Sequence, residues 1–482
     1  MATDIQQYHI GNNRGNKRIW LQGRVLEDHG FVAGTRYNRS ATDGRVTLIL
    51  AADGRYVVSG RKRSGSITPI IDMESRDISE NFEGCDAVKL VYKGGSIVIS
   101  QSDLDARIKS REQRFVRTVN AGKPLNCASL YMGGGILDAG LHEGFKLSDL
   151  PAQVKVAVEI ESKYLDSSVR NNDFWAPDAL RLNSPMELML FGSSAPEGIH
   201  VLSGGVPCTG ASRGGRSKNK IQFAEDHEKA GAQIFYTLQW VANLHPSLCI
   251  FENVIEYAST ASWSIAKGVL DNLGYVICYR EFSGAEFGAL EDRKRMVAVA
   301  VSKGLHAALE FNIDAVMPRK TKPAVLADVL EVVSEDSDVW GQCSYLVAKQ
   351  SRDLVDGKGF RLQWLDAEIA ETVGCIGRGY FKRRSTEPMV KHPTRNGFVR
   401  LLTPAEHAAC KTIPIKLIDG IDSLSIVHEI IGQSVVYEWF ACLGTYIGRW
   451  TKAAASIYSG RMPRPVFTQE ASDNQPQTEM AL

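Results

Sequence analysis

The chain has 482 residues, 44% hydrophobic and 23% charged, which is the composition of a globular protein of about two to four domains. Its formal net charge of +1 excludes a polycation, so any nucleic-acid binding must come from local basic patches. Nine scattered cysteines, with no CxxC pair and no close Cys/His cluster, favour a reducing cytoplasm and predict no metal site. No signal peptide precedes the first domain and no apolar run approaches the ~18 residues of a membrane span, so we expect no membrane contact.

Residues 1–118 are predicted to form a β-rich N-terminal domain, with a DNA-binding or accessory role. Short apolar or alternating runs separated by Asp-Gly and Gly-Gly turns are typical of strands; these are RIWLQG, RVTLIL, RYVVSG, AVKLVY and GSIVIS. The charged stretch 103–117 predicts a helix that leads into the next domain. Residues 18–39 resemble the small swapped-hairpin β domains of some bacterial DNA-binding regulators.

Residues 119–304 alternate between strand and helix patterns. The predicted strands are 124–131, 154–161, 198–205, 247–254 and 295–304, and the predicted helices are 136–145, 223–244 and 261–275. This alternation predicts an α/β domain with a largely parallel sheet. In such sheets ligands bind beyond the carboxyl ends of the strands.

The C-terminal part is predicted to contain three further regions. Residues 305–399 lose the alternation and carry the basic segments PRKTKP and GRGYFKRRS. Residues 400–465 are predicted helices that complete the α/β domain, with Thr403, Pro404 and Glu406 placed as a capping box. Residues 466–482 are polar and proline-bearing, so we expect a disordered tail.

A glycine loop and an acid mark the first part of the α/β domain. In SLYMGGGILDAG, residues Gly133 and Gly135 permit close approach of the backbone to a ligand at a helix N-terminus. Glu159 ends the next strand, where open α/β folds often place an acid that binds ribose hydroxyls. Strand–helix packing and a solvated carboxylate would explain each feature alone. Together they favour a nucleoside-containing cofactor.

Cys208 follows the third strand, Glu252 ends the fourth, and Arg293 and Arg295 precede the last one. The strand pattern therefore predicts that a thiol, a carboxylic acid and two guanidinium groups meet at one edge of the sheet. A cysteine after a strand is more often buried and inert. Here the glycine-rich flank supplies mobility, and the arginines favour the reactive thiolate form.

These segments resemble six motifs of the cytosine-C5 methyltransferase family, in the family's order over residues 129–436. They are SLYMGGGILDAG, GGVPCTGAS, FENV, EFGALEDRKRMVAVAVSKG, RLLTPAEHAACKTIP and EIIGQSVV. The resemblance implies an S-adenosylmethionine-dependent methyltransferase (Rossmann-like) sheet with a smaller target-recognition domain, here 305–399, beside the β-rich N-terminal domain. The chain departs from the family pattern at Glu291, where glutamine is usual, and at Gln433, where asparagine is usual.

The resemblance implies a DNA (cytosine-5-)-methyltransferase that acts on a base flipped out of a specific DNA sequence. Cys208 would attack C6 of the base, Glu252 would hold N3 and the exocyclic amine, Arg295 would bind the O2 side, and Arg293 would support the loop. The cofactor would be S-adenosyl-L-methionine. The residues that the resemblance assigns to it are Tyr131, Gly133, Gly135, Glu159 and Gln433.

The expected partner is double-stranded DNA, and a cognate restriction enzyme is a candidate second partner. The predicted DNA contacts lie in the basic loop RGGRSKNK and in GRGYFKRRS; they are Arg213, Arg216, Lys218, Lys220, Arg378, Lys382, Arg383 and Arg384. Two alternatives share the fold: a transfer-RNA cytosine-C5 methyltransferase and a catalytically silent DNA-binding protein. A nicotinamide-dependent oxidoreductase would explain the glycine loop but not the cysteine. The recognised sequence and the oligomeric state are not predicted.

Overall fold

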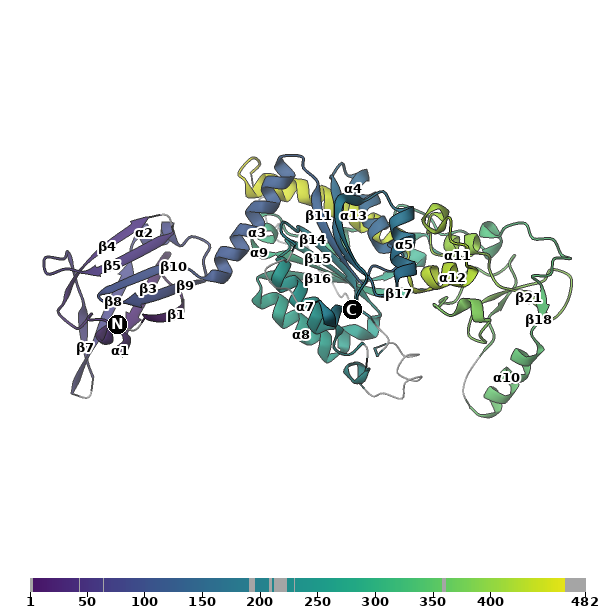
Figure 1. Cartoon of the computed structure of the whole chain (residues 1–482), viewed down its shortest axis with the longest axis horizontal. Coiled ribbons are helices and arrows are strands. Elements are labelled where there is room, and N and C mark those ends of the chain that lie inside the picture. The colour runs from purple at the N-terminus through teal and green to yellow at the C-terminus, as the bar shows by residue number, and fades with distance from the viewer. Residues whose placement is uncertain are drawn as a thin grey trace, which may run out of the picture. The chain divides into compact units, whose positions relative to one another are not determined.

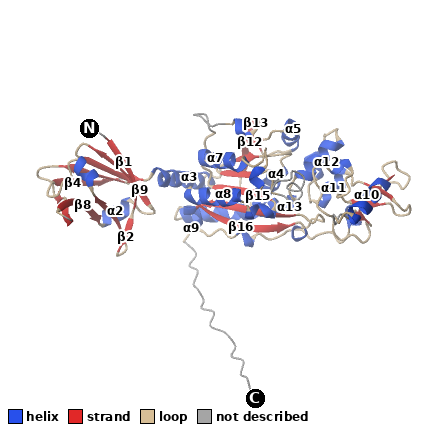
Figure 2. Cartoon of the chain, turned by 90° about the horizontal axis from the view of Figure 1, so that it is seen from below, coloured by secondary structure: helices blue, strands red, loops and turns tan. Residues whose placement is uncertain are grey.

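The computed structural model of the chain describes residues 3–42, 44–63, 65–189, 196–207, 210–211, 223–228, 230–357 and 361–463. The chain divides into two units, Met1–Ser110 and Arg111–Leu482. Strands make up most of the first unit, whereas the second mixes helices and strands (Figure 2). Within the described ranges, no helix is both long and apolar enough to cross a membrane.

The first unit contains two antiparallel sheets. The six-stranded sheet has the order β1-β9-β10-β5-β4-β6 and the four-stranded sheet the order β2-β3-β8-β7. The elements are β1 Thr3–His9, β2 Gly11–Asn13, β3 Asn16–Gln22, α1 Arg24–Asp28, β4 Arg36–Thr42, β5 Arg45–Leu50, β6 Tyr56–Val57, β7 Ser59–Arg63, β8 Ser66–Glu74, α2 Arg76–Asn81, β9 Ala87–Lys93 and β10 Ser96–Gln101. Alternate residues of β3, β5, β8, β9 and β10 are buried in a common core, and the strands confirm the predicted β-rich character of this part of the chain.

Helix α3, Asp103–Asn120, crosses the division between the two units. Its second half is fixed in the second unit by buried charged side chains. The Arg111 guanidinium donates to the carbonyl oxygen of Gly274 at 2.7 Å and to the Ser302 hydroxyl at 2.9 Å. The Glu112 carboxylate accepts the Gly304 N–H at 2.7 Å. Since buried charges need such partners, the start of the second unit is firmly defined.

A seven-stranded sheet forms the centre of the second unit, in the order β13-β12-β11-β14-β15-β17-β16 (Figure 1). Strand β17 runs antiparallel to both of its neighbours, β15 and β16, whereas the other neighbouring strands pair in parallel. The strands are β11 Leu125–Leu130, β12 Ala152–Val158, β13 Trp175–Leu182, β14 Val201–Gly205, β15 Leu248–Asn253, β16 Tyr275–Ser283 and β17 Lys294–Ser302. Because β17 is reversed, its first residues lie at the edge where the parallel strands end.

Helices cover both faces of this sheet. Helix α4 (Ile136–Leu147) and α13 (Tyr437–Tyr458) lie on one face, and α7 (Gln233–Leu244) and α8 (Ala261–Asn272) on the other (Figure 1). Helices α4 and α13 approach closely because glycine replaces larger residues at their contact. A Cβ at Gly140 would lie 2.9 Å from the carbonyl oxygen of Tyr437. This packing fixes the helix that follows the glycine loop.

The remaining elements of the second unit include a small sheet in the C-terminal half and four further helices. Residues 305–399 contain a small four-stranded sheet with its own apolar core. Its elements are β18 Gly341–Gln342, α10 Ser344–Val355, β19 Trp364–Leu365, β20 Met389–Lys391 and β21 Phe398–Arg400. Helices α5 (Ser162–Asn171), α9 (Lys303–Ala308), α11 (Pro404–Cys410) and α12 (Leu424–Gln433) complete the unit. The Thr403–Glu406 capping box is confirmed at the start of α11.

Several predicted boundaries are wrong for local reasons. The helix predicted over 223–244 begins at Gln233, and residues Ala224–Asp226 form a separate 3-10 helix before it. The helix predicted over 261–275 ends at Asn272, two residues before Gly274, which has a positive φ of 75°. Strand β16 follows directly and was not predicted, nor were α5 and β13. The disordered tail predicted for 466–482 lies outside the described residues.

Buried histidines predict loss of stability in acid. Burial lowers the pKa of His142, His200 and His428 to about 4, and lowers that of His407 well below its ordinary value. At His200, Nδ1 accepts the Asn126 N–H at 3.0 Å, which requires an unprotonated nitrogen. The unfolded chain binds protons below pH ~6.5 that the native chain rejects, so stability falls from there towards pH 4.

Each such histidine is expected to cost about 1.4 kcal/mol of unfolding free energy per pH unit in that range. Urea unfolding at pH 7.5, 6.5 and 5.5, followed by tryptophan fluorescence, measures this slope. The variant His200→Gln, whose amide oxygen can still accept the Asn126 N–H, is expected to show a shallower slope. Exposed His9→Gln is the control, and equal slopes in both variants would contradict the prediction.

Candidate active site

Glu252 and Arg295 meet at the edge of the central sheet where the parallel strands end. Glu252 is the penultimate residue of β15, and Arg295 is the second residue of the reversed neighbour β17. The Arg295 Nε lies 3.1 Å from Glu252 Oε1, and the two side chains are 14% and 13% exposed. An ion pair that is partly open to solvent can still receive a ligand. The predicted proximity of these two residues is confirmed.

The chain reaches Cys208 from the same place. Gly205 ends β14 opposite Glu252, so close that a Cβ there would lie 3.3 Å from Glu252 Oε2. Buried Asn253 donates from its side-chain amide to the carbonyl oxygen of Val206 at 3.1 Å. It thereby fixes the backbone two residues before Cys208. Cys208 itself lies outside the described residues, so its predicted role stays a prediction.

Arg293 lies behind this edge and not on it. Its side chain is 6% exposed, and its Nη1 donates to Glu291 Oε1 at 3.2 Å and to Cys375 Sγ at 3.2 Å. These contacts tie the segment before β17 to residues of the 305–399 region. The supporting role predicted for Arg293 stays a prediction.

The predicted cofactor residues gather at the neighbouring strand ends. Glu159 directly follows β12, and its carboxylate accepts the N–H of Gly133 at 2.7 Å and that of Glu161 at 2.9 Å. Burial raises the pKa of Glu159, while these two hydrogen bonds lower it. A Cβ at Gly133 would lie 3.6 Å from Nε2 of exposed Gln433. Gly133, Glu159 and Gln433 are therefore brought together.

Tyr131 and Gly135 shape the glycine loop. Tyr131 has a positive φ of 57°, and its hydroxyl contacts the carbonyl oxygen of Gln233 at 3.0 Å and the Thr237 hydroxyl at 3.0 Å. Gly135 has φ 77° and precedes the first residue of α4. Residues other than glycine rarely adopt this backbone conformation. Tyr131 thus anchors the loop to α7, and Gly135 turns it into α4.

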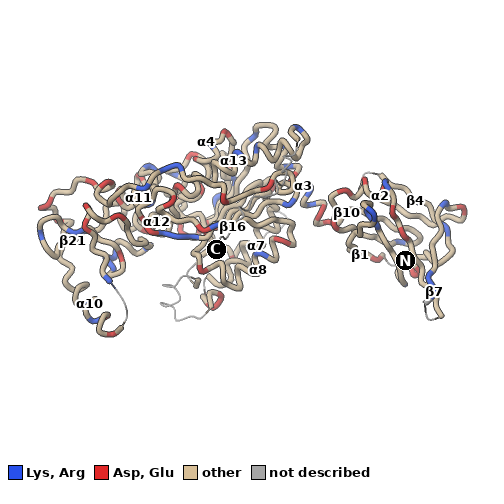
Figure 3. The backbone as a smooth tube through the Cα atoms, turned by 180° about the vertical axis from the view of Figure 1, so that it is seen from behind, with Lys and Arg blue, Asp and Glu red and all other residues tan. Residues whose placement is uncertain are grey.

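The predicted DNA contacts fall into two groups. Arg213, Arg216, Lys218 and Lys220 lie outside the described residues. In the second group, the Arg378 guanidinium lies 3.4 Å from Glu161 and 5.5 Å from the centre of the Tyr164 ring, so α5 and its flank already engage its charge. Lys382 and Arg384 are exposed, and Arg383 is half-buried. Basic and acidic residues are interspersed along this region (Figure 3). The DNA contacts stay predictions.

Sequence reasoning missed three features of the site. Asn253 is the residue after Glu252 in FENV, and its buried amide orients the chain towards Cys208. Ile160 follows Glu159 and is 61% exposed, an apolar surface beside the cofactor edge. Lys411 is completely buried against Glu291. The position of Ile160 directly after a strand-end acid could have indicated that it lies at the sheet edge. No local sequence pattern indicates that Lys411 is buried. Metal-binding clusters of three or more His, Cys, Asp or Glu side chains are absent from the described ranges.

Comparison with known proteins places this site in a family. Residues 125–448 match the model of the C-5 cytosine-specific DNA methylases. Type II methyltransferase M.SsoII of Shigella sonnei is 27% identical over 244 residues, which cover 49% of this chain and only 60% of that protein. The crystal structure of S. pombe Dnmt2 methyltransferase aligns with a TM-score of 0.52 at 15% identity, over 68% of this chain and 98% of that one, and shows a shared fold. The family match spans well over half of the sequence, so the chain belongs to the C-5 cytosine-specific DNA methylase family.

Proposed function

We propose that this protein transfers a methyl group from S-adenosyl-L-methionine to C5 of a cytosine in double-stranded DNA. The observation that carries the proposal is the Glu252–Arg295 pair, which stands where β14 leads towards Cys208. The glycine loop and Glu159 lie at the ends of β11 and β12, in the same sheet. Base-binding and cofactor-binding groups thus share one sheet edge.

The residues suggest a covalent route. C5 of cytosine is a poor nucleophile, and addition of the Cys208 thiolate to C6 forms a C–S bond that moves electron density to C5. Glu252 would hydrogen-bond the N3 edge and the amine, and Arg295 would neutralise charge on the O2 side. C5 would then take the methyl group that S-adenosylmethionine supplies, with S-adenosylhomocysteine as the second product. A base would remove the proton from C5, and the electron pair left there would expel the Cys208 thiolate. The cysteine is regenerated, so the step balances.

The residues at the cofactor edge fit an S-adenosylmethionine molecule. Each Glu159 oxygen accepts one backbone N–H and keeps a second lone pair for a ribose hydroxyl. The positive φ of Gly133 and the absence of its side chain leave the loop backbone open to a ligand. Exposed Ile160 offers an apolar surface to a flat ring. Gly133, Glu159 and Gln433 would hold the cofactor, which supplies the methyl group.

Duplex DNA is the proposed substrate because the chain carries regions that can surround it. The basic segment 213–220 begins five positions after Cys208 in the sequence, and the separate small sheet of the 305–399 region fits a target-recognition domain. A side chain at a sheet edge cannot reach a stacked base, so the cytosine must leave the helix. A cognate restriction enzyme is a candidate partner of such a methyltransferase.

Labelled S-adenosylmethionine tests the proposal. The protein is incubated with the label and unmethylated plasmid DNA of mixed sequence, and separately with total cellular RNA. Digestion to nucleosides is expected to yield labelled 5-methyldeoxycytidine from the DNA alone. Labelled 5-methylcytidine only from the RNA would select the RNA methyltransferase. Binding of DNA without any label transfer would select the catalytically silent protein.

A further inference from the structure

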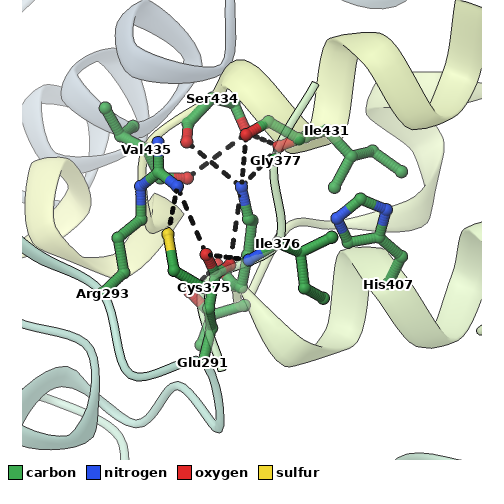
Figure 4. Close-up of polar contacts among 12 residues, drawn as sticks. Glu291, Arg293, Cys375, Ile376, Gly377, His407, Ile431, Ser434 and Val435 are labelled. Carbon is green, nitrogen blue, oxygen red and sulfur yellow. Dashed lines mark hydrogen bonds and ion pairs between the residues drawn. The ribbon is translucent and has the colours of Figure 1, made fainter. Parts of the chain in front are cut away.

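A buried charge cluster surrounds Glu291 (Figure 4). Glu291 and Lys411 are both 0% exposed, and Glu291 Oε2 lies 3.4 Å from Lys411 Nζ. The other oxygen, Glu291 Oε1, accepts from Arg293 Nη1 at 3.2 Å and from the Ile376 N–H at 3.0 Å. Each carboxylate oxygen therefore faces a cation. Glutamate stands here at the position where the family pattern has glutamine.

Neither charge could be kept in this place alone. Removing a charge from water is costly, and a buried ion persists only when opposite charge and hydrogen bonds compensate it. Burial lowers the pKa of Lys411 to about 8, and the largest opposing influence is Glu291. Glu291 therefore supplies the negative charge that Lys411 requires, and Lys411 shares the compensation of Glu291 with Arg293.

The ammonium group of Lys411 also holds the end of α12. Its Nζ donates to the carbonyl oxygens of Ile431 at 2.6 Å, Gly432 at 3.2 Å and Ser434 at 3.3 Å. A cation at a helix C-terminus satisfies carbonyls that have no partner within the helix. Gln433 lies among these residues and reaches Gly133 of the glycine loop. Lys411 thus fixes the element that carries a proposed cofactor residue.

Glu291 fixes the other side of the site. Through Arg293 it holds the segment that enters β17, where Arg295 follows two residues later and pairs with Glu252. The backbone adds to this, because the Glu291 N–H donates to the carbonyl oxygen of Cys410 at 3.1 Å, next to Lys411. One ion pair therefore connects the base-binding edge with the cofactor edge.

We propose that the Glu291–Lys411 pair is a positioning device that sets Arg295 and Gln433 together, so that the base and cofactor sites keep one relative geometry. This inference rests on the proposed methyl transfer. Neither side chain touches a substrate in this arrangement; both act through Arg293 and through the end of α12. Because the two side chains act together, we expect the loss of one charge to disturb the site more than the replacement of both.

Three variants test the unit: Glu291→Gln, Lys411→Gln and the double variant. Glu291→Gln leaves the Lys411 ammonium and the Arg293 guanidinium without their carboxylate, and Lys411→Gln leaves Glu291 with Arg293 as its cation. The double variant puts two amides that can hydrogen-bond in place of the Glu291–Lys411 ion pair. The singles are expected to lower kcat about 10- to 100-fold and to weaken S-adenosylmethionine binding about 10-fold, as coupled neighbours do. The double variant is expected to recover to within about 3-fold of wild type in both measurements.

Calorimetry with S-adenosylmethionine alone, methylation of unmethylated plasmid DNA, and melting temperature are measured for every variant. Glu406→Gln is the matched control, because Glu406 is also 0% exposed and pairs with buried Arg400 at 2.6 Å. It is expected to lower the melting temperature without changing cofactor affinity or the kcat of the folded protein. If the single variants behave like this control, the pair is merely structural and the proposal fails.

The outcomes separate this inference from the proposed function. If the wild-type protein binds no S-adenosylmethionine and methylates nothing, the proposed function fails and the inference fails with it. If the wild type is active but the double variant is as impaired as the worse single variant, only the positioning unit is disproved. If a single variant folds too poorly for kinetics, the double variant is compared with wild type directly. Activity and cofactor affinity within about 3-fold of wild type would then support the positioning unit, and a larger loss would disprove it.

Discussion

Replacing Cys208 by alanine is expected to abolish methyl transfer, lowering kcat by at least about 10³-fold. The loss follows because no other side chain can form the bond to C6 that makes C5 nucleophilic. Cofactor affinity is expected to stay within about 2-fold of wild type, since the glycine loop and Glu159 lie on other strands. Transfer of labelled methyl groups to DNA and calorimetric titration with S-adenosylmethionine measure the two quantities.

DNA that contains 5-fluorocytosine locates the nucleophile directly. Fluorine at C5 cannot leave as a proton does, so the enzyme is expected to remain bonded to the base after methyl transfer. A covalent complex that survives denaturing electrophoresis should form with wild type and be absent from Cys208→Ala. Cys278→Ala is the control, since Cys278 is a half-buried thiol on β16, away from the strand ends. Adduct formation by Cys208→Ala would place the nucleophile elsewhere.

The sheet-edge chemistry could be predicted from the sequence because it depends on strand ends. The positions of Glu159 and Glu252 at the ends of apolar runs, and of Arg295 at the start of one, are local features that survive errors in helix boundaries. The parallel strands β12 and β15 bring the two glutamates to one edge of the sheet, and Arg295 reaches the same edge because β17 runs antiparallel to β15. The register of β15 and β17 confirms this for Glu252 and Arg295.

The parts that escaped prediction depend on contacts between distant residues. Strand β16 is half-polar and takes its register from β17, so its pattern alone did not mark it. Lys411 directly follows α11, and the sequence of this helix does not indicate that the lysine is buried. Its partner Glu291 lies 120 positions earlier in the sequence. A charged residue in a helix pattern is usually solvated. Only the packed structure shows that these two charges compensate each other.

The change Glu252→Gln is expected to lower kcat about 10²- to 10³-fold with little change in the KM for S-adenosylmethionine. Glutamine keeps the shape of the side chain but removes the anion that holds the cytosine amine and balances Arg295 at 3.1 Å. The Arg295 guanidinium would then face the substrate without its partner. Steady-state methylation of plasmid DNA over a range of cofactor concentrations separates the two constants.

The matched control is Glu281→Gln, the same chemical change on exposed residue 281 of β16 in the same sheet. It is expected to retain full activity, because its exposed side chain contacts Tyr279 and its register partner is Met296, which has no proposed role in the reaction. The rate of adduct formation with 5-fluorocytosine DNA should fall in Glu252→Gln by the same factor as kcat, since the carboxylate acts while Cys208 attacks C6. A fall in kcat with an unchanged adduct rate would instead assign Glu252 to a later step, such as proton loss from C5, and would overturn its proposed role in activating the ring.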